Sequence, residues 1–396
     1  MESKELKEKQ IHTEGLIGQI QLKGLNLQAE GARQMTNLQT ISASWVICDS
    51  WAGVAGTIAL AISQGGPITL IYGPILMLFL VGACALTLAE LASVYPTAGG
   101  QYHWTSILAP KSINRSLSYC CGMTNVFSWI AICTGIAIIP AQLIVGIALF
   151  YNPSYTPQPG WSSGGVAFLT GLVTPNYMYA GIDGALHLAE DVPIYEMWYE
   201  ATRSQTAATV FVVLLCCAAV FALIGAQQTA SRLTWSLARD RAIIGSQWLS
   251  EIHPVLEVPV WSLLFNFVVM FIIGCIYLGS SSAFNAFIGS GLVLQHISYA
   301  FPAALLMYRK RSEEWLPASR SFRLPNLAGW TVNVITIGFA LLVLVFYDLP
   351  TVLPVTGSNM NYTSAVLGVM AIFGGLNWVI HARKKYDGPR LGHSGE

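Results

Sequence analysis

A carboxylate and two glycines lie close together inside the first strongly apolar stretch of the chain. Asp49 is followed by Trp51, Gly53 and Gly56. Glycine weakens a helix. A carboxylate inside a bilayer costs free energy, so one that is present usually has a function. We therefore predict a broken helix whose freed backbone groups hold a polar or cationic substrate, with Asp49 pairing with an ammonium group or carrying a coupling proton. The alternative is that Gly53 and Gly56 only allow close helix packing.

A second stretch has a similar composition, with a proline, two tyrosines and two glycines around one carboxylate. Its residues are Pro175, Tyr177, Tyr179, Gly181, Asp183 and Gly184. Because proline removes a backbone donor from a helix, we expect a second discontinuity here. The aromatic rings of both stretches can face a cationic headgroup by cation–π attraction. The two stretches together form the predicted substrate-binding site.

Three titratable residues continue from the second stretch. Asp183, His187 and Glu190 are spaced at i, i+4 and i+7, which places them on one face of a helix. Because histidine titrates near neutral pH, such a line can relay a coupling proton. Alternatively, His187 and Glu190 mark the point where the helix leaves the membrane. The His-x-x-Glu spacing is also half of a metal site, but no second cluster in the sequence completes it, so we expect no metal.

The elements that must position these residues are membrane-spanning helices. Charged residues are 10% of the 396 and apolar residues 54%, whereas soluble domains carry about 25% charged residues. A spanning helix needs about 20 mostly apolar residues. The stretches that qualify are 41–62, 68–91, 118–148, 165–187, 206–230, 258–279, 283–307, 329–347 and 361–380. Because backbone groups in lipid need internal partners, we predict an all-α, polytopic membrane protein with about nine transmembrane helices.

The remaining composition argues against other classes of protein. The formal net charge is zero, so no nucleic-acid partner is expected. The cysteines all lie inside apolar runs without metal-ligand spacing, which predicts a packing role. The sequence contains no paired catalytic cluster, nucleophile motif or phosphate-binding loop, so we expect neither an enzyme nor a cofactor. The expected partners are a small solute, a coupling proton and the lipid bilayer.

The distribution of Lys and Arg predicts the topology. Basic residues gather in the arm 1–40, in 92–117, in 231–257, after the seventh stretch and in the tail 382–396, whereas 63–67, 151–163, 280–282 and 349–360 have none. By the positive-inside rule the basic segments and both termini are cytoplasmic. The predicted organisation is a cytoplasmic arm over 1–40, a transmembrane domain over 41–381 and a cytoplasmic tail over 382–396.

This topology contains one conflict. An even number of crossings has to separate the basic loops 92–117 and 231–257, but the sequence offers three apolar stretches there. The stretch 118–148 is too short for two crossings at about 1.5 Å per residue. Either one stretch does not cross or a crossing is absent from the chain, and the conflict falls between His187 and Thr206.

Four runs carry a family resemblance, and the long run that ends at Trp104 is the most specific of them. They are Ala89–Trp104 (AELASVYPTAGGQYHW), Gly181–Val192, Ala230–Asp240 and Ser282–Phe287. These runs resemble segments of the fungal amino acid/choline permeases of the amino acid–polyamine–organocation superfamily. The resemblance implies twelve spans, built as an inverted five-helix repeat plus two helices, with broken first and sixth helices that form the substrate site. Asp49–Gly56 and Tyr177–Gly184 match those two broken helices.

The chain departs from the family pattern at two junctions. Residues 152–158, which resemble the loop before the fourth span, run almost directly into Gly160, which resembles the start of the sixth. Pro193 is followed at once by Ile194, which resembles the far side of the seventh span. The resemblance therefore implies a remnant of the bundle that lacks three spans, and the second junction coincides with the topological conflict.

The resemblance implies a secondary transporter of the plasma membrane. Its expected substrate is an amino acid, GABA, choline or a related small amine, carried by alternating access in a proton-coupled, symporter-type cycle. The alternative is a truncated member of the same family that does not transport.

Overall fold

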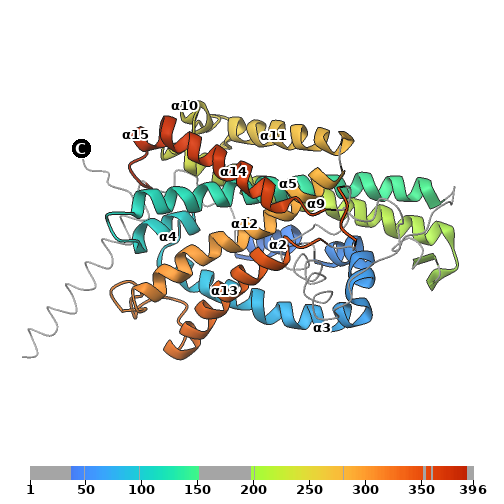
Figure 1. Cartoon of the computed structure of the whole chain (residues 1–396), viewed down its shortest axis with the longest axis horizontal. Coiled ribbons are helices and arrows are strands. Elements are labelled where there is room, and N and C mark those ends of the chain that lie inside the picture. Colours follow the sequence, from blue (N-terminus) through green and yellow to red (C-terminus); the bar gives the residue numbers. More distant parts are fainter. Residues whose placement is uncertain are drawn as a thin grey trace, which may run out of the picture.

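The computed structural model describes residues 37–48, 50–97, 99–150, 198–199, 201–279, 281–350, 354–357 and 360–389, and every regular element among them is a helix (Figure 1). The helices are α2 (Asn37–Cys48), α3 (Ser50–Val94), α4 (Gln101–Leu108), α5 (Asn114–Phe150), α9 (Gln205–Arg239), α10 (Ser246–Leu249), α11 (Val260–Gly279), α12 (Ser281–Tyr308), α13 (Asn326–Phe346), α14 (Thr363–Asn377), a π-helical turn (Trp378–Ala382) and α15 (Arg383–Lys385).

Six helical segments of the described part are long and apolar enough to cross a membrane. They are Ile68–Val94, Asn114–Ile138, Gln205–Arg239, Ala283–Tyr308, Asn326–Phe346 and Thr363–Lys385, and Val260–Ile276 is a shorter apolar helix. All of the predicted spans coincide with described helices except 165–187, which lies outside the described residues. The predicted all-α polytopic fold is confirmed. Its physical reason is that a long apolar run in lipid can form its backbone hydrogen bonds internally as a helix.

The helix α3 is divided by a sharp bend at Gly66. This residue has φ 62° and ψ −152°, which is not helical, and the membrane-spanning segment begins just after it at Ile68. Only glycine adopts such a conformation without steric cost. The bend lies in the segment 63–67, which separates the first two predicted spans.

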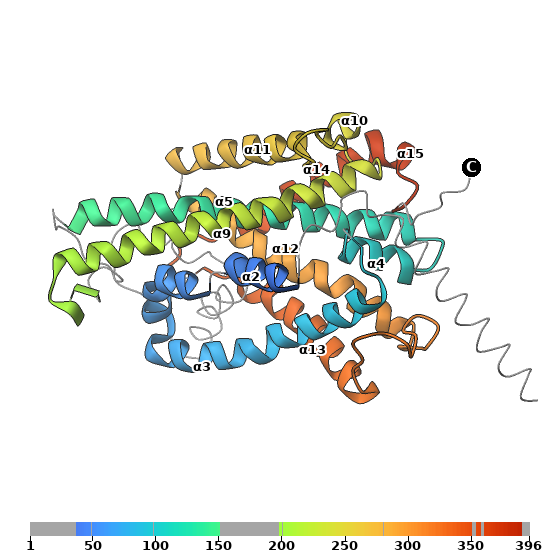
Figure 2. The same ribbon diagram turned by 180° about the vertical axis from the view of Figure 1, so that it is seen from behind.

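The basic segments that the structure describes meet at one end of the molecule, which we call the basic end. Arg309 Nε donates to the carbonyl of Leu108 at 2.7 Å, and Arg115 Nη2 donates to the carbonyl of Arg383 at 2.8 Å. In both views α4, α10 and α15 lie at this end of the long axis (Figures 1 and 2). Described basic segments that are far apart in the sequence therefore lie together in the fold.

The helices α5, α9 and α12 form the central scaffold. The helix α9 presents the small residues Ala219, Ala222, Ala226 and Ala230 to α5, all of them buried in one apolar cluster. Small side chains at this spacing let two membrane helices approach closely. In both views α5 and α9 run side by side along the molecule (Figures 1 and 2).

The chain leaves α5 and enters α9 at the end opposite the basic end. The short helical stretch before α9 packs there, with Trp198 and Tyr199 against the α5–α9 cluster and the Trp198 ring 5.4 Å from that of Phe211. Among the described residues, α5 and α9 are the two long helices between the basic loops 92–117 and 231–257. The stretch 165–187 and both unusual junctions lie outside the described residues.

A close contact between α12 and α5 gives a stability prediction. A Cβ atom at Gly291 would lie 2.9 Å from the Ala131 Cβ and 3.4 Å from the Ile132 nitrogen, whereas a Cβ at Gly338 meets nothing within 4 Å. We expect Gly291→Ala to lower the free energy of unfolding by about 1–3 kcal/mol through overpacking. The matched change Gly338→Ala should be neutral or stabilise by up to about 1 kcal/mol.

Thermal unfolding of the purified protein in detergent, followed by tryptophan fluorescence, measures both variants. Equal effects of the two substitutions would contradict the close α5–α12 contact.

Candidate functional site

The structure describes only part of the predicted substrate site. The helix α2 ends at Cys48 and α3 begins at Ser50, so two separate helices flank Asp49, which lies outside the described residues. Trp51, Gly53 and Gly56 belong to the helical backbone of α3. The residues Tyr177, Tyr179, Gly181, Asp183, Gly184, His187 and Glu190 all lie outside the described part. Their roles in substrate binding and proton coupling stay predictions.

The described residues instead bring together two buried charged networks at the basic end. Both start from the segment Glu90–Trp104, which joins α3 to α4. The sequence indicated a family resemblance for this segment but did not predict that it forms buried ion pairs. The signal that could have located the networks was the carboxylate at the end of an apolar helix, together with the surplus of arginine in 309–323.

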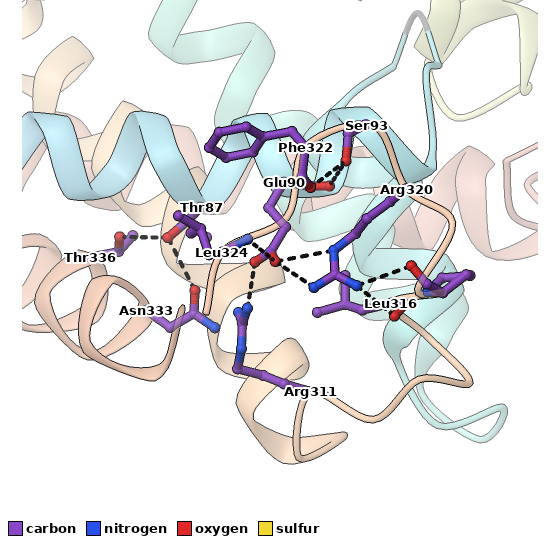
Figure 3. Close-up of polar contacts among 11 residues, drawn as sticks. Thr87, Glu90, Ser93, Arg311, Leu316, Arg320, Phe322, Leu324, Asn333 and Thr336 are labelled. Carbon is purple, nitrogen blue, oxygen red and sulfur yellow. Dashed lines mark hydrogen bonds and ion pairs between the residues drawn. The ribbon is translucent and has the colours of Figure 1, made fainter. Parts of the chain in front are cut away.

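The first network surrounds the carboxylate of Glu90 (Figure 3). The side chain is fully buried and accepts hydrogen bonds from Arg311 Nη2 at 2.5 Å and from Arg320 Nη2 at 2.9 Å. The backbone N–H of Leu324 donates to the same carboxylate at 3.3 Å. Charge-assisted bonds of this kind are about twice as strong as neutral ones. Glu90 therefore binds the loop between α12 and α13 to the end of α3.

Neutral hydrogen bonds extend this connection along α3 (Figure 3). One turn before Glu90, Thr87 Oγ1 donates to Asn333 Oδ1 at 3.1 Å and lies 3.3 Å from Thr336 Oγ1, both on α13. One turn after it, Ser93 Oγ donates to the carbonyl of Phe322 at 3.2 Å. The end of α3 is thus fixed to α13 as well as to the loop that precedes it.

A glycine on α13 makes room for one of the two arginines. A Cβ atom built at Gly329 would overlap the guanidinium group of Arg311. The guanidinium is almost fully buried and cannot move away from Gly329 into solvent without breaking its ion pair with Glu90. The requirement for glycine at this position comes from the ion pair and not from the backbone conformation.

The second network joins α4 to the end of α9. Tyr102 Oη donates to Asp240 Oδ2 at 2.9 Å and lies 2.7 Å from Ser236 Oγ. His103 Nε2 lies 3.5 Å from the same carboxylate oxygen, and both side chains are fully buried. The Arg239 guanidinium approaches the other oxygen of Asp240 at 3.6 Å. The carboxylate at the end of α9 therefore has polar or cationic neighbours on two sides.

Two consecutive glycines place the residues of this second network. Gly100 has φ 51° directly before α4, a conformation that favours glycine. A Cβ atom at Gly99 would overlap the rings of Tyr102 and His103. The Gly99–Gly100 pair is therefore needed for the entry of the chain into α4 and for the position of both rings.

Burial changes the acidity of both rings. It raises the pKa of Tyr102 well above its ordinary value, an effect that the negative charge of Asp240 reinforces. Burial lowers the pKa of His103 below 6.5, and the nearby Asp240 carboxylate opposes this shift. Both groups are therefore uncharged at neutral pH, and they hold α4 against α9 by hydrogen bonding and packing.

Nothing in the described part of the chain forms a metal centre. Among these residues no group of three or more His, Cys, Asp and Glu side chains lies close enough to hold a metal ion. The charged side chains of the two networks are used to connect helices at one end of the bundle.

Comparison with known proteins shows the family. A family model described as amino acid permease matches residues 38–181 and 160–372. The chain belongs to the amino acid permease family. The match covers most of the chain and confirms the resemblance to fungal permeases of the amino acid–polyamine–organocation superfamily. This permease is therefore a transmembrane transporter and not an enzyme.

Three fungal relatives extend this result. The permease is 23% identical to a choline transporter of Saccharomyces cerevisiae, over 86% of this chain and 80% of the relative. It is 26% identical to a transmembrane transporter of Metarhizium robertsii, over 89% and 92%, and to a swainsonine transporter of Arthroderma benhamiae, over 91% and 93%. These alignments run over 454, 474 and 472 positions. Each is longer than the 396 residues of this chain, so the relatives contain residues that have no counterpart here.

The Glu90 network predicts a large and specific effect on stability. Glu90→Gln leaves two buried guanidinium groups without a counter-charge, which should lower the free energy of unfolding of the permease by about 3–5 kcal/mol. Glu313→Gln changes an exposed carboxylate of the adjoining loop and should have little effect. Thermal unfolding in detergent compares the two variants. Near-equal melting temperatures would show that Glu90 does not carry the connection.

The His103 environment predicts a dependence of stability on pH. Because the folded-state pKa is below 6.5, the unfolded chain takes up a proton more readily and stability is lost as the pH falls below 6.5. His103→Gln should reduce this slope by up to about 1.4 kcal/mol per pH unit. His253→Gln, at an exposed histidine, is the matched control. Unfolding measured between pH 5 and pH 8 tests the slope, and an unchanged slope in His103→Gln would contradict the assignment.

Proposed function

We propose that this permease carries a small amine across the fungal plasma membrane by proton-coupled alternating access. The observation that carries the proposal is the family match across residues 38–372, joined by relatives whose names include a choline transporter. The substrate class that fits best is a compact organic cation or zwitterion such as choline, GABA or an amino acid.

The carboxylates of Asp49 and Asp183 are the proposed partners of the substrate ammonium group. Each stands beside glycines and aromatic residues in an otherwise apolar stretch. A carboxylate in such surroundings attracts a cation far more strongly than it would in water. Asp183 also begins the line of titratable residues with His187 and Glu190, which is the proposed path of the coupling proton.

The basic end is the proposed cytoplasmic side. This orientation follows from the positive-inside rule applied to the gathered arginines and lysines. Alternating access requires each end of a transporter to open in turn. The Glu90 and Asp240 networks join α3, α4, α9 and the α12–α13 loop at this end. We propose that the state described here is closed on that side, and that opening separates at least one of the two networks.

A second candidate function has an observation in its favour. The relatives align over more positions than this chain contains, in keeping with the proposed absence of three spans. A chain without those spans would lack part of the scaffold around the substrate site. It would then be a membrane protein of the same family that does not transport.

Uptake measurements separate these possibilities. The unaltered permease is produced in a yeast strain without endogenous amine permeases, and uptake of labelled choline, GABA and amino acids is followed. Asp49→Asn and Asp183→Asn should each lower uptake at least tenfold, because the substrate cation loses its counter-charge. Asp387→Asn, at an exposed position near the C-terminus, should leave uptake unchanged.

A fluorescent tag reports delivery of each variant to the plasma membrane. Absence of uptake by the unaltered permease despite normal delivery would favour the second candidate, a membrane protein of the same family that does not transport. Normal uptake by both Asp→Asn variants would instead show that the substrate site lies elsewhere. A rise in uptake at lower external pH, lost in a His187→Gln variant, would support proton coupling.

A further inference from the structure

An apolar groove of about 520 Å³ lies between α14 and the helices α5, α12 and α13. Its walls include Met123, Phe127, Leu294, Leu367, Met370 and Trp378. None of the described residues that line it is acidic or basic. The groove is therefore unsuited to a small amine, which would need a carboxylate or a ring of polar groups, and its walls fit a hydrocarbon chain.

The depth of the groove comes from two glycines on α14. Gly374 and Gly375 line it, and a Cβ atom at either position would meet nothing within 4 Å. The hydroxyl of Tyr119 on α5 donates to the carbonyl of Gly374 at 2.8 Å and accepts a hydrogen bond from Asn377 at 2.7 Å. These two hydrogen bonds hold α14 against α5 near the basic end.

Three exposed cations follow the groove at the same end. Arg383, Lys384 and Lys385 form α15, which directly follows the π-helical turn that begins at the groove residue Trp378. Arg115, next to the groove residue Ser116, donates to the carbonyls of Arg383 at 2.8 Å and Tyr386 at 2.5 Å. These two bonds place α15 at the Ser116 end of the groove.

The cations of α15 are available to a ligand. All three side chains are exposed. No carboxylate forms an ion pair with them in the part of the chain that the structure describes. The acidic residue nearest in sequence is Asp387, which is exposed as well. An apolar groove on the side of a membrane bundle, ending beside unpaired cations, has the complementary chemistry of an acyl chain attached to an anionic headgroup.

We propose that this groove binds an anionic glycerophospholipid, with an acyl chain between α14 and α5 and the phosphate beside α15. Clusters of basic residues at the cytoplasmic end of membrane helices are a recurring headgroup site. The bilayer supplies such a lipid to the side of the bundle. The groove residues named above are not among the proposed substrate-binding residues, so the proposal does not depend on which solute is transported.

Lipid retention measured by native mass spectrometry tests the proposal. The full-length permease is purified in a mild detergent and mixed with phosphatidylserine or phosphatidylcholine of the same acyl chains. The unaltered protein should retain phosphatidylserine preferentially. Gly375→Leu should abolish this preference, because it adds a bulky side chain at a position that lines the groove, where a Cβ atom meets nothing within 4 Å. Gly368→Leu makes the same change on α14, also in open space but away from the groove, and should retain the lipid.

The headgroup is tested independently of the groove. Replacing Lys384 and Lys385 by Gln should weaken phosphatidylserine binding about fivefold for each lysine. Lys310→Gln alters an exposed lysine of the α12–α13 loop, which lies across the basic end from α15 in both views (Figures 1 and 2), and should change nothing. Circular dichroism confirms that each variant is folded.

Three results would overturn the proposal. They are equal retention of phosphatidylserine and phosphatidylcholine, equal behaviour of Gly375→Leu and Gly368→Leu, and a crosslink showing that the groove is occupied by another segment of this chain or by a second copy. Loss of transport activity in the Asp49→Asn variant has no bearing on these outcomes, so the two proposals fail independently.

Discussion

A carboxylate buried at the end of an apolar helix needs a counter-charge, and the architecture of the basic end follows from meeting that need at Glu90. The two guanidinium groups that neutralise it come from one loop, so that loop has to lie against α3. Arg311 then requires a glycine on α13 where its guanidinium passes. Removing Glu90 would leave both guanidinium groups buried without a counter-charge, which is a costly state for such groups.

The segment Glu90–Trp104 connects several helices through buried polar contacts of this kind. Its first residue joins α3 to the α12–α13 loop, and its last turn joins α4 to α9 through Tyr102 and His103. The glycines between them provide the turn and the space for the two rings. A segment that connects four parts of the bundle is constrained at each of these contacts, and it coincides with the run by which the family resemblance is recognised.

The three proposals concern three different regions: the charged networks at the basic end, the substrate carboxylates in apolar stretches, and the groove beside α14. The charged networks are confined to the basic end, where opening would have to break buried ion pairs. The proposed substrate carboxylates belong to apolar stretches that would place them within the membrane. The described walls of the groove beside α14 carry no charged side chain, and the cations of α15 lie at its Ser116 end. A transporter that binds its solute centrally and an anionic lipid laterally would keep the two chemistries apart.

Local composition determined the class of this protein. Apolar runs of about 20 residues in lipid favour helices, so the described spans were predicted from hydropathy. The described basic loops lie together at one end. The run Ala89–Trp104 was enough to indicate the family. The roles of Asp49 and Asp183 stay predictions. Only the tertiary structure paired Glu90 with Arg311 and Arg320, which are 221 and 230 positions away, or made Gly329 necessary. Hydropathy is a property of neighbouring residues in sequence, whereas ion pairing depends on where distant helix ends meet.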